Sequence, residues 1–288
     1  MSKILLHVFE HTVYDSFKML PFLFLAYLLI EYIEYRKSHS IENILSRTGK
    51  LGFVAGALLG CIPQCGFSVL AANFYAGRII TAGTLVAVFV STSDEAVPVL
   101  LANPESADIV LKLIFVKIII ALIAGFLTDL FLLRRLKQDK TSLSEQIHED
   151  ICFDCNCEKH GILYGAFRHT LSVYVFIFVI SFILNTAIEL IGSERLASLL
   201  LTGTVFQPVI ATIIGLIPNC ASSVLLAELL ISGAISFGSA ISGLCAGTGV
   251  GILVLFKANK YTKENVYILL IVSLTGIISG LILQALGV

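Results

Sequence analysis

A six-residue segment with a proline at its centre occurs twice in this chain, 155 residues apart. It reads GCIPQC at residues 60–65 and GLIPNC at residues 215–220, and each copy lies inside a long apolar stretch. Over the sixteen positions 57–72 and 212–227, eight residues are identical. A proline that interrupts apolar segments at matching places in two halves is typical of transporters built from internal repeats. The sequence therefore predicts a duplicated membrane protein.

The composition supports this class. Of 288 residues, 57% are hydrophobic and 14% are charged, with a mean hydropathy of +0.94. A membrane-spanning helix needs about 20 predominantly apolar residues. The candidate stretches are residues 17–33, 51–75, 79–101, 109–133, 171–191, 199–231, 235–256 and 266–286. We expect an all-α polytopic protein embedded in the lipid bilayer, and no nucleic-acid partner because no basic stripe is present.

Clusters of Lys and Arg predict which connections face the cytoplasm. Basic residues gather within 36–50, 134–140 and 257–263, and the positive-inside rule places these connections on the cytoplasmic side. An even number of crossings must separate the first two clusters, yet three apolar stretches lie between them. A re-entrant hairpin at 51–75 resolves this, because Pro63 removes a helix donor in mid-segment.

The second half repeats the argument with Pro218 in the stretch 199–231. We therefore predict two inverted-topology repeats, each with three spanning helices and a proline-broken re-entrant hairpin, giving about ten helical segments and both termini outside. The expected organisation is a first transmembrane repeat at 1–133, a cytoplasmic loop at 134–166 and a second repeat at 167–288. The alternative is that both prolines only kink long tilted helices.

Amide and thiol side chains follow both prolines at matching positions. They are Gln64 and Cys65 in the first copy and Asn219 and Cys220 in the second. An amide oxygen can bind a cation, and a thiolate binds softer ions. Each residue also has a structural alternative, because amides cap helices and buried cysteines pack as small hydrophobic groups. We expect the two breaks to meet in one substrate site.

Two adjacent acids lie in the middle of the stretch 79–101. Asp94 and Glu95 would be costly at membrane depth, where acids line polar pathways, carry protons or coordinate ions. The matching stretch 245–251 (CAGTGVG) has breakable backbone but no charge, which predicts an asymmetric site. Asp94, Glu95 and Glu228 are the candidates for proton coupling. Alternatively, the acids belong to a loop between two shorter helices.

The predicted cytoplasmic loop contains a short Cys- and His-rich tract, HEDICFDCNCEKH. Its potential metal ligands are His148, Cys152, Cys155, Cys157 and His160. Such tracts indicate metal binding, and four of these side chains could surround Zn²⁺. Chance clustering in a polar loop is the alternative. Cytoplasmic thiols stay reduced, so we expect no disulfide framework, and no cofactor is required.

The order of these features resembles the ten-transmembrane heavy-metal exporter family, whose members are also labelled arsenic efflux or manganese transporter proteins. The resemblance spans nearly the whole chain. Its matching pieces are GCIPQCGFSV, STSDEAVPVLL, ICFDCNCEKHGI, RHTLSV, GLIPNCASSV and VGILVLFKANK. The resemblance implies metal export.

The leading functional prediction is a secondary transporter, not an enzyme, that exports a transition-metal cation, with Mn²⁺ as first choice, in exchange for protons. The expected location is the plasma or inner membrane of a prokaryotic cell, with a homodimer as a candidate assembly. No P-loop motif occurs that would indicate ATP-driven pumping. The alternatives are arsenite or organoarsenical efflux through Cys65 and Cys220, a thiol oxidoreductase using Cys61 and Cys65, and a metal sensor.

Overall fold

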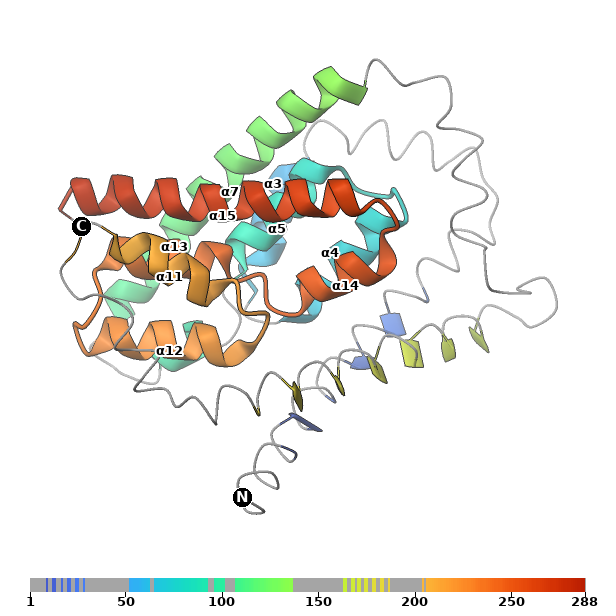
Figure 1. The fold of residues 1–288 in the computed structure, drawn as a ribbon, viewed down its shortest axis with the longest axis horizontal. Helices are drawn as coiled ribbons and strands as arrows, with labels where there is room; N and C mark the ends of the chain where they lie inside the picture. The colour runs from blue at the N-terminus through green and yellow to red at the C-terminus, as the bar shows by residue number, and fades with distance from the viewer. Residues whose placement is uncertain are drawn as a thin grey trace.

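The computed structural model is helical, and the predicted all-α fold class is confirmed for the residues it describes. These residues are 52–62, 65–92, 96–101, 107–136 and 206–287, together with Thr204 and single helical positions between 9 and 28 and between 163 and 186. Figure 1 shows the arrangement of their helices.

The described helices form two units of equivalent elements. The first unit contains α3 (Gly52–Gly60), α4 (Cys65–Ala76), α5 (Ala82–Ser91), α6 (Ala96–Leu101) and α7 (Ala107–Leu136). The second contains α11 (Gln207–Gly215), α12 (Cys220–Ile231), α13 (Phe237–Ala246), α14 (Gly251–Ala258) and α15 (Thr262–Ala285). Every helix of the second unit begins 155 residues after its counterpart, from Gly52 and Gln207 to Ala107 and Thr262. The repeat seen in one motif therefore extends over both units.

Within the described residues, four segments are long and apolar enough to cross a membrane. They are Ala82–Leu101, Asp108–Phe131, Phe237–Ala258 and Thr262–Ala285. These segments confirm the predicted spans 79–101, 109–133, 235–256 and 266–286. The first and third are each interrupted, between α5 and α6 and between α13 and α14. The break after α13 confirms the breakable backbone predicted at 245–251, whereas the break after α5 adds a helix end beside the predicted acids.

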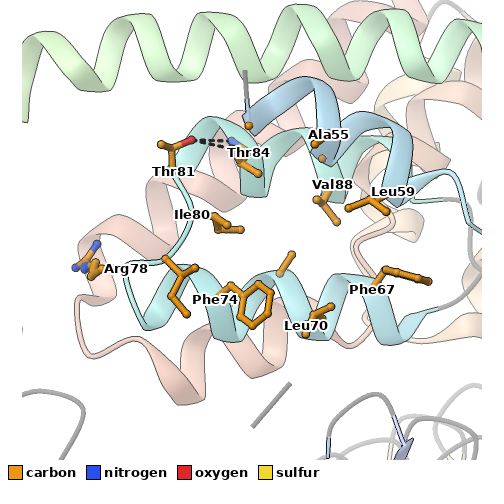
Figure 2. A pocket seen from close by; sticks show the side chains of 14 residues that line it. Ala55, Leu59, Phe67, Leu70, Phe74, Arg78, Ile80, Thr81, Thr84 and Val88 are labelled. Atoms are coloured by element: carbon orange, nitrogen blue, oxygen red, sulfur yellow. Dashed lines mark hydrogen bonds between the residues drawn. The ribbon is translucent and has the colours of Figure 1, made fainter. Parts of the chain in front are cut away.

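The two proline-containing stretches consist of short helices. The arms α3 and α11 have 9 residues, and α4 and α12 have 12. At 1.5 Å per residue each arm reaches roughly 14 to 18 Å, about half of the hydrocarbon thickness. Figure 2 shows α3 and α4 facing each other across a pocket lined by residues of both helices. This arrangement favours the predicted hairpin over a kinked helix in the first unit.

The helices α5 and α13 form the centre of the molecule, and all or nearly all of their residues are buried. In each unit the first hairpin arm and the long last helix pack against this central helix. The second arms cross over, because α4 packs on α14 and α12 packs on α6. Figure 1 shows α14 beside α4 on one side and α12 on the opposite side. Such reciprocal pairing is what two copies related by a two-fold axis produce, and the orientation of the copies in the membrane stays a prediction.

The repeated glycine of the two segments allows a close helix crossing. A Cβ atom on Gly215 would lie 2.0 Å from the Gly243 carbonyl oxygen of α13. A Cβ atom on Gly60 would lie 2.0 Å from Ser91 Oγ and 2.7 Å from the Val88 carbonyl oxygen of α5. Small residues let membrane helices approach this closely. Gly60 and Gly215 therefore hold the first hairpin arm against the central helix.

The long helices carry apolar side chains on their outer faces. On α15 an exposed row repeats every four residues: Val266, Leu270, Leu274, Ile278 and Ile282. On α7, Phe115 and Phe131 are also exposed. A continuous apolar surface of this length is unfavourable in water and fits lipid hydrocarbon. The exposed faces thus support the membrane assignment made from hydropathy.

An ion pair joins the two units near one end of α15. The Arg78 guanidinium, in the turn after α4, lies 2.8 Å from the Glu264 carboxylate. The Tyr75 hydroxyl donates to the same carboxylate at 3.0 Å, and the guanidinium lies over the Tyr261 ring at 4.9 Å from its centre. These contacts fix the exit of the first hairpin to the start of α15.

Candidate ion-binding site

The broken central spans place helix ends inside the molecule. The α5 helix ends at Ser91 and α6 begins at Ala96, so the predicted acids Asp94 and Glu95 fall between them, outside the described residues. In the second unit α13 ends at Ala246 and α14 begins at Gly251. In this gap Gly249 has a left-handed backbone, with φ of 55°, which glycine adopts without a steric penalty.

The second arms of both hairpins contact the break between α13 and α14. A Cβ atom on Gly251 would lie 2.7 Å from Ser68 Cβ, which belongs to α4. A Cβ atom on Gly247 would lie 3.5 Å from Ser223 Oγ, which belongs to α12. Ser68 and Ser223 are equivalent residues, 155 positions apart, and both are buried. The second arms of the two hairpins, α4 and α12, therefore both lie against one interrupted span, and the meeting of the two proline-containing tips stays a prediction.

The second hairpin break is a tight turn around Pro218. The Asn219 amide donates to the Ile217 carbonyl oxygen at 2.7 Å, which closes a three-residue turn with the proline at its centre. Asn219 is the N-cap of α12, and its Oδ1 accepts from the Ala221 amide at 3.4 Å. The structure therefore gives Asn219 the capping role that was one of its two predicted alternatives. Its buried side chain still lies at the hairpin tip.

Cysteines lie at both hairpin breaks. Cys220 is the first residue of α12, is half-buried and forms no disulfide bond, and Cys65 begins α4 at the equivalent position. The Cys61 thiol donates to the Ala57 carbonyl oxygen at 3.1 Å, within its own helix end. Cys245 is fully buried in α13, where it packs as a small hydrophobic group. Pro63, Gln64 and the Cys65 side chain lie outside the described residues.

A buried lysine lies beside the ends of both central helices. Lys117, on the inward face of α7, has no exposed surface. Its Nζ atom donates to the Thr92 carbonyl oxygen at the end of α5 and, at 2.8 Å, to the Leu244 carbonyl oxygen in the last turn of α13. One ammonium group thus bridges the two units. The geometry places a cation at the C-terminal ends of two helices, where the helix dipoles favour positive charge.

The remaining predicted residues are not brought to this location by the described part of the chain. Glu228 is exposed on α12, whereas its equivalent in the first unit, Asn73, is buried and donates to the Val69 carbonyl oxygen. The tract with His148, Cys152, Cys155, Cys157 and His160 lies outside the described residues. Within those residues, no group of three or more His, Cys, Asp or Glu side chains could hold a metal ion.

The first hairpin also encloses an apolar pocket of about 320 Å³ (Figure 2). Leu59 of α3, Leu70 and Phe74 of α4, and Val88 of α5 line it, and Thr81 and Thr84 form a hydrogen bond at its rim. Hydrocarbon side chains provide no ligands for an ion. This pocket is therefore distinct from the candidate ion-binding site at the broken spans.

Two charged residues of α7 were missed by the sequence prediction. Lys117 is one of them. The other is Asp129, whose carboxylate accepts from the Gly83 amide at 2.8 Å and from the Thr81 hydroxyl at 2.9 Å, at the start of α5. The available signal was a charge inside the apolar stretch 109–133, because ionisable residues within a span usually face the protein interior.

The fold and the site define a class of protein. A multi-pass helical protein with exposed apolar faces, and with polar groups gathered where matching spans are interrupted, is a membrane transporter. The model of the family described as "Putative, 10TM heavy-metal exporter" matches residues 5–190 and 163–288. The chain belongs to this family, as the sequence resemblance predicts, and is a transporter of the heavy-metal efflux class, not an enzyme. Searches of curated proteins and of solved structures found no match.

Proposed function

We propose that this protein exports a divalent transition-metal cation, with Mn²⁺ as the preferred substrate, and that protons move in the opposite direction. The family supports metal export, and the residues at the breaks support the choice of cation. Carboxylate, amide and carbonyl oxygens are the ligands that ions such as Mn²⁺ prefer. The proposed location is the plasma or inner membrane of a prokaryotic cell, with both termini outside and a homodimer as the candidate assembly.

One observation carries this proposal: the second arms of both hairpins, α4 and α12, contact the interrupted span of the second unit. By the internal repeat, the equivalent interruption in the first unit is the position of Asp94 and Glu95. The proposed ligands are these two acids with Gln64 and Asn219, and the neighbouring thiols of Cys65 and Cys220 complete the set. Broken helices in transporters commonly coordinate substrate and coupling ions in this way.

Proton coupling follows from the same acids. A carboxylate inside a membrane protein is stabilised by a bound proton or by a bound cation, so Asp94 and Glu95 would exchange one for the other. Glu228 is the third proposed proton carrier. The Cys- and His-rich tract is proposed to bind Zn²⁺ or the exported metal at the cytoplasmic side, without being required for the transport step.

Trivalent arsenic is the second candidate substrate. The observation in its favour is that the two cysteines lie at equivalent positions, Cys65 at the start of α4 and Cys220 at the start of α12. Two thiolates are the type of ligand that a soft metalloid prefers. In that case the two cysteines, and not the acids, would determine transport.

Uptake into everted membrane vesicles tests the proposal. Vesicles that contain this protein should accumulate Mn²⁺ under an inward-acidic proton gradient, and Asp94→Asn should abolish uptake while the protein remains folded. Asp108→Asn is the matched control, because Asp108 is exposed in the first turn of α7. Equal uptake by the Asp94 variant would contradict the role of Asp94. Accumulation of arsenite without any divalent cation would refute the choice of substrate.

A further inference from the structure

Lys117 occupies a position that is costly for a charged side chain. It lies ten residues after the start of α7, about 15 Å along the helix axis and thus roughly at the middle of the membrane. On the same inward face, Leu113 and Ala121 are fully buried. A lysine at such depth is favourable only with strong acceptors for its ammonium group.

Two of its acceptors are backbone carbonyl groups at helix ends. The Thr92 carbonyl belongs to the C-cap of α5, and the Leu244 carbonyl belongs to the last turn of α13. The Thr248 amide, four residues after Leu244, donates to the Ala246 carbonyl oxygen instead, at 2.9 Å. The Leu244 oxygen is therefore not the acceptor of that amide. In transporters, the backbone carbonyl groups at interrupted helices coordinate cations.

The lysine is present in only one of the two units. Its equivalent on α15, 155 positions later, is Val272, which is fully buried. The two carbonyl acceptors, by contrast, come from both units, one from each central helix. A single cation can therefore satisfy both helix ends at the boundary between the units. In this structure the Lys117 ammonium is that cation.

We propose that the ends of α5 and α13 form a cation-binding position that Lys117 fills when no metal ion is bound, and that the exported cation displaces the ammonium group. This inference rests on the proposed export of a divalent cation. The Thr92 and Leu244 carbonyl oxygens are ligands of the type that Mn²⁺ accepts. Because Lys117 is attached to α7, its displacement would couple ion binding to the contact between α7 and the two central helices.

Direct Mn²⁺ binding to the purified full-length protein tests the inference. Binding is measured from the loss of the electron paramagnetic resonance signal of free Mn²⁺, with the protein in detergent. Lys117→Gln, which keeps a hydrogen-bond donor but removes the competing charge, should tighten Mn²⁺ binding about tenfold or more. Lys117→Arg, which keeps the charge on a side chain that does not lose its proton, should weaken it by about tenfold or more. Lys112→Gln, an exposed lysine on the same helix, should bind as the unaltered protein does.

The two variants distinguish competition from a purely structural role. If Lys117 only joins the helix ends, arginine can take over this structural role and Mn²⁺ binding by the Lys117→Arg variant is unchanged. That result would overturn the inference. Unchanged or weaker binding by a folded Lys117→Gln variant would do the same. If the unaltered protein binds no Mn²⁺ but Lys117→Gln does, the inference is supported although the proposed substrate fails the vesicle assay. If neither binds Mn²⁺, the inference is wrong.

Discussion

Arg78 and Gly233 occupy equivalent positions in the two units, and both have a left-handed backbone, with φ of 57° and 71°. The same turn after the second hairpin arm is therefore formed once by glycine and once by arginine. Glycine adopts this conformation without a steric penalty, whereas another residue needs compensating contacts. For Arg78 these contacts are the Glu264 carboxylate and the rings of Tyr75 and Tyr261.

Gly233→Ala should lower the free energy of unfolding by about 1 kcal/mol, because of the left-handed backbone alone. Apart from its two chain neighbours, no atom of the described residues lies within 4 Å of the added Cβ position, so no steric contact with them contributes. Thermal unfolding in detergent, followed by the helical circular dichroism signal, checks this expectation. Gly77→Ala is the matched control, since its Cβ would make only ordinary contacts, the nearest at 3.5 Å, and its φ is not left-handed. Equal effects of both variants would contradict the backbone argument.

Glu264→Gln should destabilise the protein by about 1 kcal/mol or less, since the ion pair is only partly buried. Burial by itself lowers the pKa of Arg78, but the hydrogen bond and the negative charge of Glu264 outweigh it, so that the pKa lies above its ordinary value. Arg78 therefore stays charged, and the variant removes an attraction that salt can screen. The difference in melting temperature between the variant and the unaltered protein should shrink from 0.1 M to about 1 M NaCl. Lys263→Gln, an exposed neighbour, should show no such salt dependence.

Gly215→Ala should be more damaging than Gly60→Ala. Both added Cβ atoms come within 2.0 Å of a neighbour, but for Gly215 that neighbour is the backbone oxygen of Gly243, whereas for Gly60 it is the Ser91 hydroxyl. The nearest backbone atom to the Gly60 Cβ is the Val88 carbonyl oxygen, at 2.7 Å, so its backbone contact is less severe. A side chain can rotate away from a contact, and a backbone atom in a packed helix cannot. The yield of monodisperse protein after detergent extraction measures the difference. A double variant, Gly60→Ala with Ser91→Ala, should recover part of the loss, and no recovery would contradict this explanation.

Asn219→Ser separates the capping role of this residue from the proposed ligand role. Serine caps helices about as well as asparagine, so the melting temperature should stay near that of the unaltered protein, whereas Asn219→Ala should cost about 1 kcal/mol. If Asn219 is also a ligand, Mn²⁺ uptake by the serine variant should fall about tenfold or more. Full uptake by a stable Asn219→Ser protein would restrict Asn219 to capping.

Most of the fold could be predicted from local sequence features. Pro63 and Pro218 lie at matching positions in two apolar stretches. The positive-inside rule requires an even number of crossings between the basic clusters, so one stretch in each half cannot be a simple span. The structure places short helix pairs in both stretches. The breakable backbone at 245–251 was also predicted, because glycine and threonine replace the apolar run in mid-span.

The contacts between the units could not be predicted in the same way. The pairing of α4 with α14 and of α12 with α6 depends on side-chain packing between segments far apart in the chain. The interactions of Lys117 were missed for a related reason. Two of its acceptors are the backbone carbonyl groups of Thr92 and Leu244, and every residue type has such a group, so no sequence pattern marks them.

The constant step of 155 residues from α3 to α15 has a consequence for the history of the chain. Neither copy has a net gain or loss of residues between the starts of these helices. Within this span the copies have therefore diverged by substitution of side chains, while the lengths from one helix start to the next stayed the same. Each functional difference between the units can therefore be located by comparing one residue with its partner 155 positions later. Lys117 with Val272, Asp94 with Gly249 and Arg78 with Gly233 are such pairs, and exchanging their side chains would show which of them gives the transporter its direction.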